Sequence, residues 1–179
     1  MLIFKMRIFI AIGIPESVKE KLRKLQKEFM GDDYRINFVE DFHLTLKFLG
    51  DISSTRLDRV KKRLEGVRFK YFELDLTRLG VFPSETYITT LWVGVKPEKM
   101  VNEIQSRVDE SLKDFFGVDK NFKAHITLGR VKSFKDKDLF LSRLKEIEVK
   151  GNFKVKSFKL IKSELGKNGP EYEILEEFK

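Results

Sequence analysis

The amino-acid sequence predicts an α+β fold built from one duplicated unit, and three observations support this prediction. Both histidines of the 179-residue chain lie in the same short pattern, His43-Leu44-Thr45-Leu46 and His125-Ile126-Thr127-Leu128, 82 positions apart. An apolar strand and a Pro-Glu pair precede each pattern, and 28 positions separate that proline from its histidine in both halves. Strand-like and helix-like segments then alternate in the same order in the two halves.

The first half begins with an apolar, β-branched segment over 7–12, which is typical of a buried strand. Pro15-Glu16 suits the first turn of a helix that extends to about residue 30. A connector with a short extended piece follows over 34–42. The rest of this half is expected to form a strand over 43–49 closed by Gly50-Asp51, a helix over 54–65 and a strand over 69–79.

The second half follows a predicted loop over 80–84 and repeats this order. Its expected elements are a strand over 87–95, a helix from Pro97-Glu98 to about 116, a strand over 122–131, a helix over 137–145, and strands over 149–163 and 172–178 joined by a turn at 166–170. We therefore expect a single domain over 1–179, with pseudo-repeat halves at roughly 6–80 and 87–165. A pseudo-twofold between the halves would place equivalent strands side by side and both histidines on facing walls of one cleft.

Composition favours a phosphate-bearing partner and excludes several other classes. The 36 Lys and Arg against 28 Asp and Glu give a net charge of +8, which favours nucleic acid or nucleotides, although a solvated charged surface has the same composition. The chain has no cysteine, so disulfides and thiolate chemistry are excluded. It has no apolar run of about 18 residues and no cleavable leader pattern. We expect a cytoplasmic protein that does not associate with membranes.

The two histidine motifs carry the predicted chemistry. In a strand alternate side chains share a face, so each histidine and its threonine point the same way. Imidazoles titrate near pH 6.5, so one can remove a proton while the other delivers one. The hydroxyls of Thr45 and Thr127 could donate to the non-bridging oxygens of a phosphate, and Arg130 could clamp that phosphate. This pair of motifs predicts displacement at a phosphorus atom, with the attacking and leaving oxygens roughly in line.

Strand alternation adds four further cleft candidates. Lys47 is expected on the face of Thr45, while Arg7 and Phe9 share one face of the first strand and Trp92 lies in the equivalent strand of the second half. Phe9 and Trp92 could flank a nucleobase or serve as core aromatics. Catalytic zinc needs three protein ligands, and two histidines without cysteine do not supply them. We therefore expect no metal and no cofactor.

These residues resemble the two-histidine phosphoesterase superfamily, marked by paired His-x-Thr-x motifs, and within it the RNA 2',3'-cyclic phosphodiesterases, long called 2'-5' RNA ligases. The segments that carry the resemblance span nearly the whole chain: 6–12, 43–50, 80–83, 91–95, 125–130, 162–165 and 169–172. The sequence departs from the family pattern at two positions. Gly13 stands where many members have Asp, and Ile36 stands where an aromatic is common.

The resemblance implies a bilobal fold in which two antiparallel sheets form a central cleft, with helices packed on the outside. It implies hydrolysis of an RNA terminal 2',3'-cyclic phosphate to a 2'-phosphomonoester without metal or ATP. We expect a monomer that acts on RNA ends such as those of tRNA fragments. His125 would be the base that activates water, and His43 would protonate the leaving 3' oxygen. The alternatives are reversible 2'-5' ligation at the same site, hydrolysis of a small substrate such as ADP-ribose cyclic phosphate, and a non-catalytic RNA-end-binding module.

Overall fold

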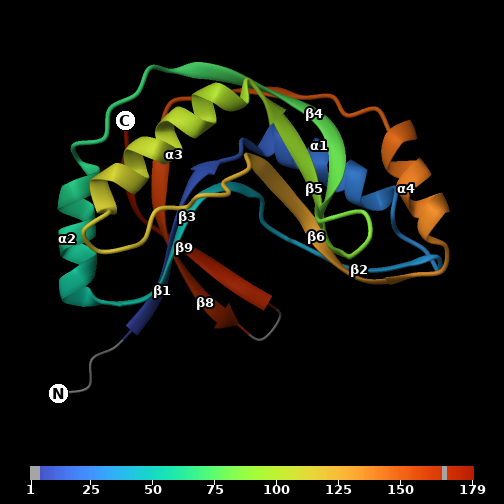
Figure 1. Ribbon diagram of the computed structural model, residues 1–179, viewed down its shortest axis with the longest axis horizontal. Coiled ribbons are helices and arrows are strands. Elements are labelled where there is room, and N and C mark those ends of the chain that lie inside the picture. The colour runs from blue at the N-terminus through green and yellow to red at the C-terminus, as the bar shows by residue number, and fades with distance from the viewer. Residues whose placement is uncertain (1–4, 167–168) are drawn as a thin grey trace.

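The computed structural model describes residues 5–166 and 169–179, which form two antiparallel sheets and four helices (Figure 1). Sheet A has the order β3-β1-β8-β9 and contains β1 (Lys5–Gly13), β3 (His43–Ser53), β8 (Phe158–Gly166) and β9 (Gly169–Phe178). Sheet B has the order β2-β6-β5-β4-β7 and contains β2 (Tyr34–Phe38), β4 (Phe72–Pro83), β5 (Ile88–Lys96), β6 (His125–Phe134) and β7 (Asn152–Val155). The helices are α1 (Glu16–Lys27), α2 (Ser54–Leu64), α3 (Glu98–Leu112) and α4 (Lys137–Glu146). The α+β class with two antiparallel sheets is confirmed.

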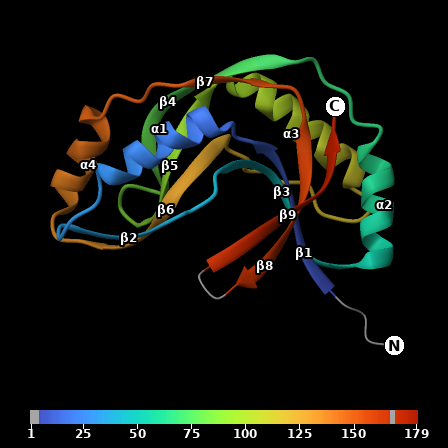
Figure 2. The same cartoon turned by 180° about the vertical axis from the view of Figure 1, so that it is seen from behind.

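The two sequence halves are interleaved in the structure. The first half supplies β1 and β3 to sheet A but β2 and β4 to sheet B, and the second half supplies β8 to sheet A and β5 to β7 to sheet B. The first helix of each half also changes sheet, since α1 packs on β6 and α3 packs on β3. Figures 1 and 2 show α1 and α4 together at the β5–β6 side and α2 with α3 at the opposite side. Each sheet is therefore built from both halves.

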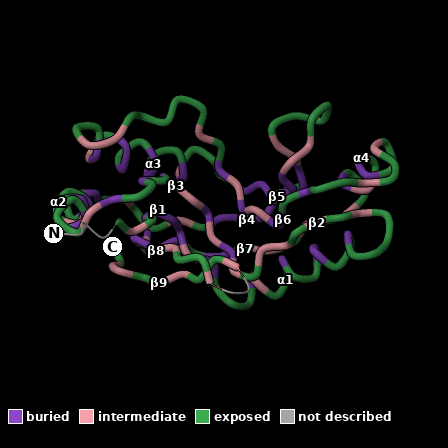
Figure 3. The backbone as a smooth tube through the Cα atoms, turned by 90° about the horizontal axis from the view of Figure 1, so that it is seen from below, coloured by how far each residue is buried: buried purple, intermediate pink, exposed green. Residues whose placement is uncertain are grey.

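One face of each sheet packs into a shared apolar core, and the other face carries that sheet's histidine. In β1, Ile8 and Ile10 point into the core, whereas Phe9 and Ala11 join Ile161 in a separate small cluster on the other face. In β5, Leu91 and Val93 belong to the core, and Thr90, Trp92 and Gly94 alternate with the core residues. We call the face turned away from the core the site face. Figure 3 shows the buried segments running along the strands, while the outer helix turns are exposed.

Both histidine strands contain a β-bulge at the same position of the motif. The pairing of β3 with β1 leaves Leu46 without a partner, and the pairing of β6 with β5 leaves Leu128 without a partner. An inserted residue reverses the alternation of the side chains that follow it, as far as the next insertion. In β3 the next insertion is at Leu49, so Lys47 and Phe48 lie on the opposite faces from those that simple counting predicts.

The structure corrects the predicted elements in the C-terminal third. The segment 149–163, expected as one strand, forms β7 in sheet B and β8 in sheet A, separated by Lys156-Ser157. Both pieces alternate between apolar and polar residues, so the pattern does not reveal the crossing between sheets. The predicted turn at 166–170 includes residues 167–168, which lie outside the described residues, and Gly166 pairs with Gly169 on either side of them.

Two predicted interruptions are wrong because glycines there permit the strands to continue. The predicted loop over 80–84 belongs to β4 as far as Pro83, and a Cβ on Gly80 would lie 2.2 Å from the Trp92 ring, so only glycine fits under that ring. Gly50-Asp51 does not end β3, because Gly50 adopts a φ of +68° and the pairing with β1 resumes to Ser53. The helices predicted to end near 30 and 116 end at Lys27 and Leu112.

Within the described ranges, no helix is long and apolar enough to cross a membrane.

Candidate active site

His43 begins β3 and is held between two aromatic rings on the site face of sheet A. Its backbone lies opposite Gly13, the last residue of β1. The centroid of its imidazole lies 4.8 Å from that of Phe9 and 5.1 Å from that of Tyr172, which meets it edge-on. Phe9 is 3% exposed and forms the floor beneath the imidazole. These contacts fix the plane of the His43 ring.

Burial makes His43 a weak base. Desolvation is the main cause that lowers the pKa of His43 from 6.5 to about 4. The nearby carboxylate of Asp41 opposes this shift, and the ammonium of Lys19 adds to it. Asp41 is itself engaged, because it forms an ion pair with Lys19 and accepts a hydrogen bond from the backbone N–H of Phe42. The Lys19 charge therefore offsets part of the stabilisation that Asp41 would give to an imidazolium.

His125 occupies the matching position on sheet B, and one hydrogen bond fixes its tautomer. Its Nδ1 lies 2.7 Å from the carbonyl oxygen of Lys123. A carbonyl only accepts, so Nδ1–H donates and the lone pair of the neutral ring lies on Nε2. Burial lowers the pKa of His125, the bond to Lys123 opposes that shift, and the charge of Arg130 adds to it. His125 is thus suited to accept a proton at Nε2.

Aromatic rings flank His125 as they flank His43. The ring of Phe82 meets the imidazole edge-on with a centroid distance of 4.8 Å, and the ring of Trp92 lies 6.3 Å away. The two histidines also share their backbone setting, because His125 lies opposite Gly94 as His43 lies opposite Gly13. The duplicated motif therefore produces a duplicated local site.

Tyr172 of sheet A and Arg130 of sheet B connect the two histidine environments. Burial raises the pKa of the Tyr172 phenol, Asp41 raises it further, and the charge of Arg130 lowers it. Tyr172 packs against His43, and Arg130 acts on both Tyr172 and His125. The strands β3 and β6 also contact each other directly. The charge of Arg130 therefore influences both His125 and the tyrosine that packs against His43.

The bulge at Leu128 brings Arg130 onto the same face as Thr127. Thr127 lies opposite Trp92 and Arg130 lies opposite Thr90, with the bulge between them. Arg130 Nη1 donates to Thr90 Oγ1 at 2.6 Å, which orients the guanidinium while leaving its side chain exposed. The equivalent Thr45 of β3 is half-buried opposite Ala11. The structure thus gathers both threonines and Arg130 on the site faces with the histidines.

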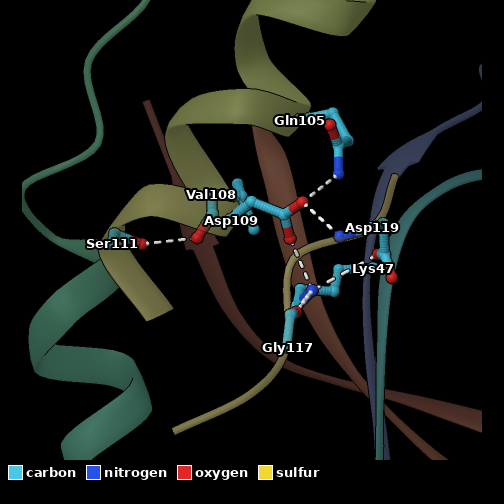
Figure 4. Close-up of polar contacts among 7 residues, drawn as sticks. All are labelled: Lys47, Gln105, Val108, Asp109, Ser111, Gly117 and Asp119. Atoms are coloured by element: carbon cyan, nitrogen blue, oxygen red, sulfur yellow. Dashed lines mark hydrogen bonds and ion pairs between the residues drawn. The ribbon is translucent and has the colours of Figure 1, made fainter. Parts of the chain in front are cut away.

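Lys47 does not lie on the site face, which corrects the prediction from strand alternation. The bulge at Leu46 turns Lys47 toward α3, where its ammonium donates to Asp109 Oδ1 at 2.5 Å and to the Gly117 carbonyl at 2.7 Å (Figure 4). Its side chain is 2% exposed and that of Asp109 is 4% exposed. Lys47 therefore stabilises the packing of α3 on β3 and is separated from any substrate.

Lys47 and Asp109 belong to a hydrogen-bond network that extends to the segment before His125. Asp109 Oδ2 accepts from Gln105 Nε2 at 2.7 Å and from the Asp119 backbone N–H at 2.9 Å (Figure 4). The carboxylate of Asp119 lies 3.3 Å from the Lys47 ammonium. The strand that begins with His43 is thereby joined to the loop that leads to His125.

The remaining cleft candidates differ in their access to a ligand. Arg7 is exposed at the far end of β1, with its Nε 3.8 Å from Asp51, and is distant in register from His43. Phe9 is buried beneath the imidazole, so its faces are already covered. Trp92 is half-buried, and its Nε1–H has no hydrogen-bond partner in the described part of the chain.

Sequence reasoning missed three aromatic residues of the site. Phe82 and Tyr172 lie within segments that carried the family resemblance, but alternation alone assigned them no role. Phe48 is 71% exposed, and its ring lies 5.9 Å from Phe9. It reaches the site face only because of the bulge at Leu46, so it could not have been found by counting along the strand.

The described residues contain no group of three or more His, Cys, Asp and Glu side chains that could hold a metal ion. A surface hollow of about 630 Å³ between α1 and α4 is lined mainly by charged side chains and includes neither histidine. The threonine hydroxyls and the Arg130 guanidinium near the two imidazoles suit acid–base chemistry on an anion.

Comparison with known proteins identifies a family. The family described as LigT like Phosphoesterase matches residues 12–92 and again residues 93–172. A Methanocaldococcus jannaschii protein named RNA 2',3'-cyclic phosphodiesterase is 33% identical, covering 97% of this chain and 100% of the relative. An Archaeoglobus fulgidus protein of the same name is 35% identical, covering 97% and 99%. The crystal structure of Thermus thermophilus TT0787 superposes with a TM-score of 0.75 at 28% identity, covering 97% of each chain. Escherichia coli LigT, in complex with 3'-AMP, shares the fold with a TM-score of 0.78 at 21% identity, covering 97% of this chain and 96% of LigT.

Proposed function

The chain belongs to the LigT-like phosphoesterase family, and on that premise we propose that it hydrolyses the 2',3'-cyclic phosphate at RNA ends to a 2'-phosphate. The observation that carries this proposal is the pair of half-buried histidines on β3 and β6, of which His125 presents an unprotonated Nε2. The relatives named RNA 2',3'-cyclic phosphodiesterase support the choice of substrate. The net charge of +8 suits a polyanionic substrate.

The reaction requires one proton to be removed and one to be delivered. Water attacks phosphorus while His125 Nε2 takes its proton, and the hydrogen bond from Nδ1–H to Lys123 supports the imidazolium that forms. The bond between phosphorus and the 3' oxygen breaks as His43 protonates that oxygen. The products are a 3'-hydroxyl and a 2'-phosphomonoester. Each histidine ends in the protonation state from which the other began, so proton exchange with solvent restores the enzyme.

His43 must be protonated to act as the acid, and substrate binding favours that state. With a pKa of about 4, the His43 imidazole of the free enzyme is mostly neutral at pH 7. A bound phosphodiester anion next to the ring favours the imidazolium and raises this pKa. The protonated His43 that the reaction needs is therefore populated mainly when a substrate is bound.

Thr45, Thr127 and Arg130 are assigned to the phosphate. The hydroxyl of each threonine donates to a non-bridging oxygen from its own sheet, and the Arg130 guanidinium neutralises the charge that develops there. The hydrogen bond from Arg130 to Thr90 sets the direction of the guanidinium before the substrate arrives. We further propose that the chain acts as one domain and as a cytoplasmic monomer on RNA ends, tRNA fragments included.

The test uses a short RNA with a 2',3'-cyclic phosphate end and separates the two phosphomonoester products by chromatography. We expect a 2'-phosphate, and His43→Ala or His125→Ala should each lower turnover by about 10²–10⁴-fold with unchanged thermal denaturation. Turnover at the wild-type rate in either folded variant would refute the assignment. A 3'-phosphate product would reverse the two histidine roles.

Metal independence is tested in the same assay. Incubation with EDTA followed by its removal should leave the rate unchanged, because proton transfer by two imidazoles needs no Lewis acid. Loss of activity that zinc restores would contradict the proposed mechanism.

A further inference from the structure

Lys159 places an ammonium group beside His43 that the proposed reaction does not use. Lys159 lies on β8 opposite Ala11, so its side chain emerges on the site face of sheet A. Its Nζ lies 3.1 Å, and its Cε 3.3 Å, from the point where a Cβ on Gly13 would sit. Gly13 is the cross-strand partner of His43. The absence of a side chain at position 13 thus opens the space that the lysine occupies.

The Lys159 side chain turns away from the carboxylate that would most simply neutralise it. Glu177 lies directly opposite on β9, and a cross-strand Lys–Glu pair would be favourable there. Glu177 instead accepts a hydrogen bond from Ser157. Within residues 5–166 and 169–179 no carboxylate oxygen lies within 4.0 Å of the Lys159 ammonium. This half-buried cation is therefore free to bind an anion that enters the site face.

The strand order places this cation on the side of His43 that is remote from sheet B. Sheet A runs β3-β1-β8-β9, and β3 is the strand of sheet A that contacts β6. The phosphorus under attack must lie between His43 on β3 and His125 on β6. Neighbouring strands are about 4.8 Å apart, so a group above Gly13 on β1 lies about one strand spacing beyond His43. Lys159 is therefore well placed for a different anion from the one that reacts.

We propose that Lys159 binds a second phosphate of the substrate, the one attached to the 5' side of the nucleoside that carries the cyclic phosphate. This inference rests on the proposed function and adds a specificity determinant to it. In RNA the second phosphate is the internucleotide phosphodiester. A dinucleotide with a pyrophosphate in that position offers the same chemistry from a small molecule. The site discriminates against a lone nucleoside 2',3'-cyclic phosphate, which has no such group.

The experiment compares kcat/KM for four substrates in the wild type and in Lys159→Met, which keeps the length of the side chain and removes its charge. The substrates are a nucleoside 2',3'-cyclic phosphate with a free 5'-hydroxyl, a dinucleotide ending in the cyclic phosphate, the same dinucleotide with an uncharged methylphosphonate linkage, and the nucleoside cyclic phosphate carrying a 5'-pyrophosphate ester. The matched control is Lys162→Met, because Lys162 lies on the same strand and already forms ion pairs with Glu164 at 2.8 Å and Glu173 at 3.4 Å.

We expect Lys159→Met to lower kcat/KM about tenfold for the charged dinucleotide, as for the loss of one charge-assisted contact, and to change it less than twofold for the nucleoside and the methylphosphonate. A matching loss for the pyrophosphate ester identifies the site as a general second-phosphate site, and its absence assigns the site to RNA. Lys162→Met should leave all four values unchanged.

An equal loss on all four substrates, or no loss on any, overturns the proposal. Binding of the 2'-phosphorylated dinucleotide product and of its methylphosphonate analogue, measured by calorimetry, gives the same comparison without turnover. If the wild type turns over none of the substrates, the proposed hydrolysis is refuted. A lower product affinity of Lys159→Met in that case would still support the second-phosphate site.

Discussion

Lys47→Met should lower the free energy of unfolding more than the same substitution at a surface lysine. The substitution keeps an unbranched side chain of similar volume and removes the ammonium that contacts Asp109, Asp119 and the Gly117 carbonyl. Asp109 would then be a buried carboxylate without a cation, in a position where its side chain is 4% exposed. The perturbation is therefore the loss of one partner from a buried ion pair.

The magnitude follows from the contacts that remain. Removing one partner of a buried pair costs about 3–5 kcal/mol, because the other charge stays out of water. Asp109 keeps hydrogen bonds from Gln105 Nε2 and from the Asp119 backbone N–H, which stabilise the carboxylate. We therefore expect a loss at the lower end, about 3 kcal/mol. Such a loss is a large fraction of the roughly 5–15 kcal/mol that stabilises a typical domain.

Urea denaturation of the wild type and three variants measures this loss. The control is Lys113→Met, because Lys113 and Glu110 have the same 2.5 Å separation, but their side chains are 53% and 69% exposed. That variant should unfold at the wild-type midpoint. The double variant Lys47→Met with Asp109→Leu removes both charges and should recover more than half of the single-variant loss, since no unpaired buried ion remains.

Two results would refute this reasoning. A loss below about 1 kcal/mol in Lys47→Met would mean that water or a rearranged partner reaches Asp109. A double variant less stable than Lys47→Met would mean that shape, rather than charge, holds α3 against β3.

Three further predictions follow from the site geometry. Burial lowers the pKa of both histidines below 6.5 in the free enzyme, and the reactive form carries one proton on the pair. The pH profile of kcat/KM should therefore peak below pH 6.5 and fall on either side. A maximum above pH 7 would contradict this assignment. Gly80→Ala would place a Cβ 2.2 Å from the Trp92 ring, so the ring must move. The near-ultraviolet circular dichroism should change, and the free energy of unfolding should fall by about 1–3 kcal/mol. An unchanged tryptophan signal would refute the close packing. Gln26→Leu would remove the side-chain donor from the partly buried Val39 carbonyl and from the buried Leu128 carbonyl, which keeps the Val39 N–H. It should cost about 1–3 kcal/mol in urea denaturation, whereas an unchanged midpoint would show that water replaces the amide.

The sequence sufficed to predict the two histidine strands and the protein family. The repeated motif and the equal distance from proline to histidine are properties of the chain alone, and the structure places His43 and His125 in matching settings. Side-chain direction beyond each motif could not be predicted, because it depends on a one-residue bulge. Because of the bulge at Leu46, Lys47 points toward α3 and Phe48 lies on the site face beside Phe9.

The assignment of strands to sheets was equally beyond the sequence. β7 and β8 are separated by two residues yet pair in different sheets, and β2 and β3 of the first half also pair in different sheets. Alternation reports that a strand has one buried face and does not report which partner lies beside it. Tyr172 reaches His43 only through the pairing of β9 with β8, whose residues lie more than 100 positions beyond the first motif.

Each half of the chain holds the histidine strand of the other half in shape. The bulge at Leu128 in β6 is stabilised by the first half, because the Leu128 carbonyl accepts from the Val39 backbone N–H at 3.0 Å and from the buried Gln26 of α1 at 2.9 Å. The residue after the bulge in β3 is held by the second half, through the contact of Lys47 with Asp109 of α3. The bulges decide which side chains join each histidine on the site face. Each histidine strand is therefore stabilised by contacts from the other half of the chain, so the two copies of the motif depend on one shared fold.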